Sequence, residues 1–217
     1  MQEFKTEEAA VIKAVGEATP KTAEKAALGA ISATAWHKFY MWLYSGVMKE
    51  FALQTFKSYR EVKANDELDE EYLTEAEEFM EETVSMREGE VLQTTRDRLR
   101  RAILAVLALG GGNEEIQAEI AKLYKHDIPI RSRAIAQTEV ITAGNAGTNF
   151  AALTVGANRK EWIAVMDNRT RDSHREVDGE IKKIEERYSN GLRFPGDPEG
   201  PAAEVINCRC VEAYLLT

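Results

Sequence analysis

The residues most suited to chemistry lie near the C-terminus, where the only two cysteines, Cys208 and Cys210, are separated by one residue. With His174 they provide two thiols and one imidazole, which are good zinc ligands. Residues two apart on an extended strand lie roughly 6.5 Å from each other, whereas two sulfurs on one zinc lie within about 4.6 Å. A zinc site made by His174, Cys208 and Cys210 therefore requires the backbone to curl or the side chains to converge.

Two other roles are open to the cysteine pair. A disulfide between Cys208 and Cys210 would close a tight and strained ring, which makes it the poorest of the interpretations. Cysteine is also a small apolar residue that is often buried. The other two histidines, His37 and His126, lie in the helical part of the sequence, so only three strong zinc ligands are available. We therefore favour a structural role for the cysteines and keep zinc as the open rival.

A set of polar, aromatic and turn-forming residues accompanies the cysteines. Its members are Glu139, Trp162, Asp167, Arg169, Thr170, Arg171, His174, Asp178, Gly179, Asn207 and Arg209. Arginine can hold a carboxylate through two hydrogen bonds, and aspartate and threonine can cap turns through their side-chain oxygens. A small β-rich unit with little core needs such a polar lattice, or a metal, to fix its structure. We expect the arginines of this set to hold its carboxylates.

The same residues raise the question of catalysis. Histidine, aspartate and arginine close together are compatible with a hydrolytic or transferase module built around His174, Asp167 and Arg171. The sequence contains no HExxH motif, P-loop or GxGxxG motif, and no Ser/His/Asp order. We predict that the chain is not an enzyme and that His174 is structural.

The elements that position these residues divide the sequence into an α-helical region, residues 1–130, and a helix followed by a β-rich, turn-rich module, residues 131–217. We predict helices over about 20–62 and 132–153, a helix that ends at Gly110–Gly112, and a short helix that reaches about Tyr124 before "HDIP" breaks it. A loop is expected near Asn65, and the small residues around Gly147 permit another element to approach closely. The fold class is therefore α+β.

Strand and turn signals follow Gly156. The apolar run "WIAVM" (162–166) predicts a buried strand, and a closing strand is expected from about Ile206. Asp178-Gly179 and Asn190-Gly191 are strong signals for tight turns. The C-terminal module is therefore expected to be a small β unit.

Large apolar residues recur at spacings of three and four in the first predicted helix. They are Trp36, Phe39, Tyr40, Leu43, Tyr44 and Val47. Such an aromatic face packs on another helix or another subunit, and we take it as the candidate partner-facing surface. The stretch 26–48 is long enough to span a bilayer, but His37 and Lys38 lie in its middle, so no membrane span is expected.

The net charge of −9 means that nucleic acid would need a local basic patch. The candidate residues for this contact are Arg96, Arg98, Arg100, Arg101, Arg131 and Arg133. Pairing of these arginines with acidic residues of the chain is the simpler interpretation. The N-terminus has no basic stretch followed by an apolar run, so a signal peptide is not expected.

The order of motifs after Trp162 resembles the phage Mu F-like family of minor head proteins, also called phage head morphogenesis proteins. The motifs are Trp162, Asp167, Thr170-Arg171, His174, Asp178-Gly179, the "PGDP" loop from Pro195 and Asn207-Cys208-Arg209-Cys210. The likeness covers about residues 131–217. Family members often carry Ala-Arg-Thr-Glu on the preceding helix; here the stretch is Ala136-Gln137-Thr138-Glu139, so that Gln137 replaces the arginine.

The resemblance implies a role in assembling the head of a tailed phage. Such proteins associate with the portal, join the procapsid before DNA enters, and in some cases contact double-stranded DNA. The implied location is the virion, and the host cytoplasm during assembly. The alternatives are a hydrolytic or transferase module centred on His174 and a zinc-stabilised DNA-binding protein.

Overall fold

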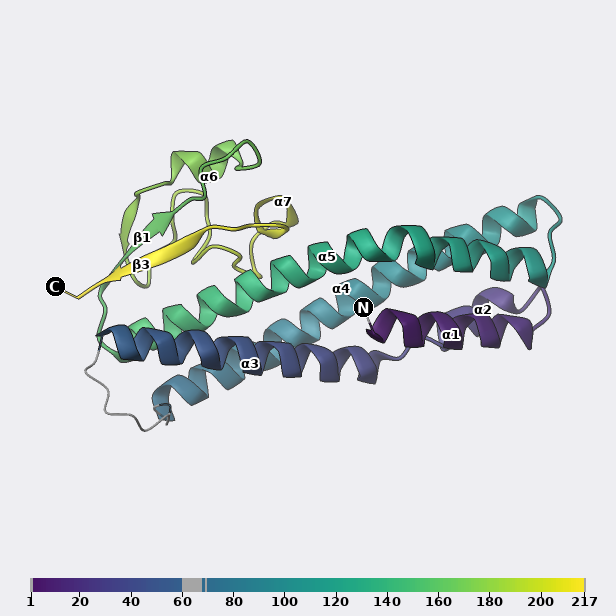
Figure 1. Cartoon of the computed structure of the whole chain (residues 1–217), viewed down its shortest axis with the longest axis horizontal. Helices are drawn as coiled ribbons and strands as arrows, with labels where there is room; N and C mark the ends of the chain where they lie inside the picture. The colour runs from purple at the N-terminus through teal and green to yellow at the C-terminus, as the bar shows by residue number, and fades with distance from the viewer. Residues whose placement is uncertain (1, 60–67, 69, 217) are drawn as a thin grey trace. The chain divides into compact units, whose positions relative to one another are not determined.

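The computed structural model describes residues 2–59, 68 and 70–216 (Figure 1). The helices are α1 (Gln2–Gly16), α2 (Ala23–Gly29), α3 (Ala33–Tyr59), α4 (Glu70–Ala108), α5 (Asn113–Thr154), α6 (Asp172–Glu176) and α7 (Ala202–Val205). The strands are β1 (Arg159–Ile163), β2 (Ile181–Lys183) and β3 (Val211–Leu215). This arrangement confirms the α+β class. The loop predicted near Asn65 lies outside the described residues.

The chain forms two compact units, each made of separate stretches of sequence. One contains Met1–Met41 and Val84–Arg133, and the other contains Trp42–Thr83 and Ala134–Thr217. Each of the helices α3, α4 and α5 contributes residues to both units. The boundary predicted between residues 130 and 131 lies inside α5. Because each unit combines two separate stretches, the units are not consecutive blocks of sequence.

The first unit is organised around a buried carboxylate on α1. Glu7 accepts hydrogen bonds from Trp36 Nε1 at 2.9 Å and from the Tyr124 hydroxyl at 2.8 Å. Trp36 also packs edge to face on Phe4, with ring centroids 4.7 Å apart. Because a buried polar group is costly without partners, these two donors explain how Glu7 is accommodated in an apolar setting.

The structure corrects the prediction that the aromatic face of α3 meets a partner, because this face is covered within the chain itself. Trp36, Tyr40 and Tyr44 are at most 3% exposed within the chain itself, and the other members of the set, Phe39, Leu43 and Val47, are half-buried. Spacings of three and four place these side chains on one side of α3, and the chain's own helices cover that side. An aromatic residue of α3 that is exposed is Trp42, at 71%.

Two helix boundaries also differ from the predictions. The helix expected over 20–62 is divided into α2 and α3, and the Ser32 hydroxyl accepts a hydrogen bond from Ala35 N at the start of α3. The predicted break at "HDIP" is absent, since α5 runs through Pro129. Proline removes one helical hydrogen bond, but tertiary packing supplies most of the stability of helices in proteins. Buried residues on both sides of Pro129, including Tyr124 and Thr138, supply that packing.

Close approach at Gly147, expected from the sequence, is confirmed within the second unit. A Cβ atom at Gly147 would lie 2.6 Å from the carbonyl oxygen of Met48 and 2.8 Å from its Cα. We predict that Gly147→Ala lowers the free energy of unfolding by about 1–3 kcal/mol, because backbone must shift to make room. Gly46 of α3 is the control, since nothing lies within 4 Å of its added Cβ. Gly46→Ala is expected to raise that free energy by up to about 1 kcal/mol. Urea denaturation followed by circular dichroism measures both, and equal changes would contradict the close packing.

The C-terminal part of the chain, coloured green to yellow in Figure 1, carries an antiparallel sheet of strand order β2-β1-β3. Alternation along β1 directs Lys160 and Trp162 inward. The first strand lies three residues before the predicted start, and β3 begins after the cysteines rather than near Ile206. Both predicted turns are present, with glycines in the left-handed region at Gly179 (φ 75°) and Gly191 (φ 85°).

The membrane question is answered for the described helices. None of them combines the length and the apolar character that crossing a bilayer requires.

Candidate metal centre and the surrounding polar network

His174, Cys208 and Cys210 converge in the second unit. The imidazole lies on the short helix α6, and its Nδ1 is 3.8 Å from Cys208 Sγ and 3.4 Å from Cys210 Sγ. All three residues are buried, and their ligand atoms lie within 4.8 Å of one another. These residues, which are far apart in sequence, therefore form a compact set of one nitrogen and two sulfur ligands.

The backbone around the cysteines is curled rather than extended. Asn207 has a left-handed conformation with φ 58°, and Cys208 N donates to Val205 O at 3.1 Å. Asn207 N donates to the Thr138 hydroxyl at 2.9 Å, which ties this turn to α5. The separation of roughly 6.5 Å expected for an extended strand therefore does not apply, and the two sulfurs lie within 4.8 Å of each other.

The second ring nitrogen of His174 faces a carboxylate. Nε2 lies 3.0 Å from Glu204 Oε2 on α7, although the angles are not those of a well-formed hydrogen bond. The Ser173 hydroxyl donates to the same oxygen at 2.8 Å, which holds Glu204 in place. The imidazole is therefore located between the two thiols and a carboxylate.

The pKa values of the two thiols are shifted in opposite directions. Hydrogen bonding from Cys208, together with a smaller contribution from His174, lowers the pKa of Cys210 to about 4, although burial opposes this. The same interaction with Cys210, and burial, raise the pKa of Cys208. One thiolate is thus already favoured, and thiolate is the form of cysteine that binds metals.

The predicted pairing of arginine with carboxylate is present at Asp167. Arg209 Nη1 and Nη2 donate to the two carboxylate oxygens, both at 2.6 Å, and Arg169 N donates to Oδ1 at 2.8 Å. The hydrogen bonds from Arg209 are the main reason that the pKa of Asp167 lies well below its ordinary range. Thr170 completes this turn, since its hydroxyl accepts from Asp167 N at 3.1 Å. The arginine between the two cysteines is therefore fixed by the turn that follows β1.

The remaining carboxylates and arginines of the predicted set have other partners. Arg171 donates to the carbonyl oxygen of Ile206 rather than to a carboxylate. Asp178 accepts from Ala164 N at 2.7 Å, and Glu139 accepts from the Tyr44 hydroxyl at 2.5 Å. A phenol therefore donates to Glu139 and a backbone amide donates to Asp178.

Comparison with known proteins places this architecture in a family. The sequence profile described as "Phage Mu protein F like protein" matches residues 93–213, more than half of the chain. The chain belongs to the phage Mu F-like family. The match begins within α4 and includes all of α5, so it extends well beyond the module from residue 131 to which the motifs pointed.

Several relatives of this phage Mu F-like chain cover about half of it. "Minor head protein GP7" of Bacillus phage SPP1 is 28% identical over 126 residues, 55% of this chain and 41% of that protein. A Haemophilus influenzae protein without an assigned function is 31% identical over 55% of this chain and 25% of its own length. "NAD(+)--arginine ADP-ribosyltransferase EFV" of Enterococcus faecalis is 29% identical over 48% of this chain and 21% of that enzyme. The chain thus spans less than half of each of these relatives, and no solved structure matches it.

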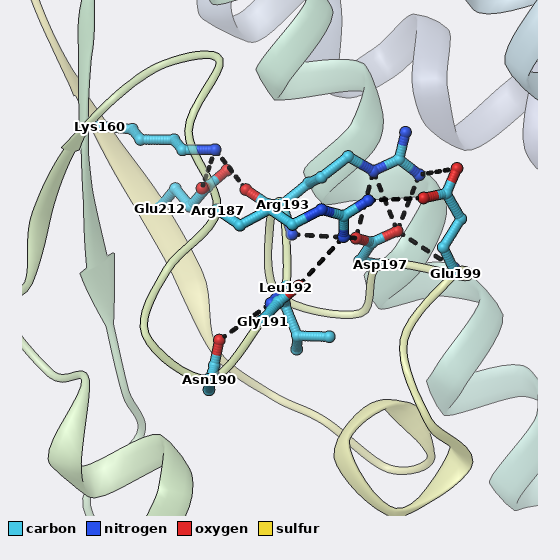
Figure 2. A network of polar contacts seen from close by, with 9 residues as sticks. All are labelled: Lys160, Arg187, Asn190, Gly191, Leu192, Arg193, Asp197, Glu199 and Glu212. Atoms are coloured by element: carbon cyan, nitrogen blue, oxygen red, sulfur yellow. Dashed lines mark hydrogen bonds and ion pairs between the residues drawn. The ribbon is translucent and has the colours of Figure 1, made fainter.

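A second polar network in the phage Mu F-like region is centred on Asp197. Figure 2 shows Arg187 and Arg193 converging on this buried carboxylate. Arg193 Nη2 donates to Oδ1 at 2.8 Å and Arg187 Nη1 to Oδ2 at 3.2 Å, while Arg193 N and Glu199 N also donate to the carboxylate. The sequence predicts only a loop at "PGDP", and the weak signal for this network is an aspartate between two prolines, close to two arginines.

Lys160 and Glu212 extend this network toward the sheet (Figure 2). Their side chains are each 1% exposed, and Lys160 Nζ lies 3.9 Å from Glu212 Oε1. Burial raises the pKa of Glu212 to about 7 although Lys160 opposes the shift, and burial lowers the pKa of Lys160. The pair places a lysine in a position where the strand pattern alone predicts an apolar side chain.

The arginines proposed for nucleic acid are largely engaged with the chain itself. Arg98 pairs with Asp127 at 2.6 Å and Arg100 with Glu24 at 2.7 Å. Arg131 donates to the Thr95 hydroxyl and the Val91 carbonyl. Arg101 and Arg133 are exposed and Arg96 is half-buried. Pairing with acidic residues of the chain, the simpler interpretation, is thus present for Arg98 and Arg100.

Proposed function

We propose that this phage Mu F-like chain acts in head morphogenesis, as part of a minor head protein that joins the procapsid of a tailed phage or prophage through the portal. The observation that carries the proposal is the family match, together with the similarity to the minor head protein of phage SPP1. Its expected location is the virion, and the host cytoplasm during assembly.

The enzymatic alternative has less support. A catalytic histidine must reach its substrate, whereas His174 is 1% exposed and faces two thiols and a carboxylate. The similarity to the ADP-ribosyltransferase covers only 21% of that enzyme, so the activity in its name is not transferred to this chain. A structural role in assembly accounts better for a buried imidazole.

Capture by the portal protein encoded in the same phage or prophage tests the proposal. The tagged chain should retain the portal protein on a column, and Trp42→Ala should weaken retention because exposed tryptophans are frequent interface anchors. Leu109→Ala, at a 90% exposed site, is the control and should leave retention unchanged. Absence of the wild-type chain from both portal complexes and procapsids would overturn the proposal.

Contact with packaged DNA is a finer part of the proposal. It would fall to Arg96, Arg101 and Arg133, since Arg98 and Arg100 form ion pairs with acidic residues and Arg131 bonds to Thr95 and Val91. Counterion release predicts that such binding weakens steeply as the salt concentration rises. A mobility shift measured over a range of salt checks this, and a flat response would argue against contact with phosphates.

A further inference from the structure

We propose that His174 Nδ1, Cys208 Sγ and Cys210 Sγ bind one zinc ion, with a water molecule as the simplest fourth ligand. Nothing in the proposed role in head morphogenesis requires a metal, so this inference goes beyond that role. It rests on the positions of the ligand atoms, on the carboxylate behind the imidazole and on the place of the cluster in the core.

The distances between the ligand atoms suit a tetrahedral zinc ion. Bonds of about 2.3 Å to sulfur and about 2.0–2.1 Å to nitrogen, at a tetrahedral angle, separate the two ligand atoms by about 3.6 Å. The separations from Nδ1 to the sulfurs are 3.8 Å and 3.4 Å, which lie on either side of that value. A zinc ion therefore needs only small movements of the side chains to enter.

The surroundings of His174 are those of a metal ligand. A histidine that binds zinc through one nitrogen almost always donates its other ring N–H to a carboxylate, carbonyl or water. Here Nδ1 faces the sulfurs and Nε2 lies 3.0 Å from Glu204, which Ser173 holds in turn. Simple thiol packing gives no reason for the carboxylate on the far side of the ring, whereas zinc binding does.

The location of the cluster explains what the zinc would do. Cys208 and Cys210 belong to a small core that includes Trp162, Tyr188 and Leu192. The sheet beside it has three strands, one of them only three residues long. Units with so little core commonly use a metal as a cross-link. Zinc would join α6 to the turn that carries Asn207 and the cysteines, and would give that turn a fixed position.

Metal content is the first test. Protein purified under reducing conditions without chelator should contain about one equivalent of zinc, and cobalt exchanged into it should show the absorption of thiolate-bound tetrahedral cobalt. Cys210→Ser and His174→Gln should lose both signals. His126→Gln, which alters an exposed histidine of α5, is the matched control and should keep them. Wild-type protein that is free of zinc and gives no cobalt spectrum overturns the proposal and leaves thiol packing as the explanation.

A second measurement leaves the three proposed ligands unchanged, so it does not depend on whether variants of the ligands fold. Glu204→Gln should weaken zinc binding by about 10–100-fold, as expected for a residue that orients a metal-binding histidine. Glu176→Gln, an exposed glutamate on α6, should leave the affinity unchanged. Chelator should lower the melting temperature of the wild-type chain, and added zinc should restore it. Equal affinities in the two variants, or a melting temperature insensitive to chelator, would contradict the site, whatever the outcome of the portal experiment.

Discussion

Trp162→Ala should lower the free energy of unfolding by about 3–5 kcal/mol, the range observed when a buried tryptophan is truncated. Trp162 is fully buried and packs edge to face on both His174 and Tyr188, with ring centroids 5.1 Å apart in each case. Its removal leaves a cavity between β1 and α6 that neighbouring side chains fill only in part. Urea denaturation followed by far-ultraviolet circular dichroism measures the loss.

Trp42→Ala is the matched control, because it removes the same side chain from a position that is 71% exposed. Substitution at such a site usually changes stability by less than about 0.5 kcal/mol. If the two alanine variants unfold at the same urea concentration, Trp162 does not organise the core of the C-terminal unit.

Asp197→Asn should lower the free energy of unfolding by about 3 kcal/mol. Removing one member of a buried ion pair costs about 3–5 kcal/mol, and the lower end applies because Arg193 and Arg187 are 35% and 47% exposed and reach solvent. The amide keeps the size of the side chain but removes its charge and one acceptor oxygen. Glu199→Gln is the control within the same network, since this carboxylate is 51% exposed and its loss should cost less than about 1 kcal/mol.

The contribution of Asp197 should also depend on pH. Burial alone would raise the pKa of Asp197, but the hydrogen bonds from Arg193 outweigh it, so the pKa is lowered. A carboxyl group with a lowered folded-state pKa stabilises the fold above its unfolded-state pKa, and this contribution is lost as the pH falls through the folded-state value. The difference in unfolding free energy between wild type and Asp197→Asn should therefore be largest near neutral pH and shrink in acid. A constant difference from neutral to acidic pH would contradict this assignment.

Local chemistry made parts of this fold predictable. Asp178-Gly179 and Asn190-Gly191 form turns because glycine adopts the left-handed conformation without strain, and both glycines do so. The glycines after Leu109 end α4 for a similar reason, with Gly110 at φ 78°. Residue type alone also suggested that His174 and the two cysteines could converge, since thiols and imidazoles are common zinc ligands and few are present in this sequence.

Features set by distant residues were not predictable from local patterns. Pro129 continues inside α5 because packing, rather than propensity, determines that helix. The strand period between Cys208 and Cys210 was misleading because Asn207 turns the backbone, and the Thr138 hydroxyl on α5 accepts a hydrogen bond from Asn207 N. The buried charge of Asp197 lies in a segment that looks like an ordinary loop, and the two prolines and the nearby arginines are only a weak signal of its burial.

The second unit combines two separate stretches of sequence, so the C-terminal stretch cannot be transferred by recombination with all of its packing partners. A gene segment that starts at residue 131 encodes the cysteines, His174 and the whole sheet, but not Tyr44, Met48 or Tyr59, which contact Glu139, Gly147 and Tyr214 within the same unit. Recombination that moves only the C-terminal segment would separate it from residues on which its packing depends. Exchange of gene segments should therefore avoid breakpoints inside α5.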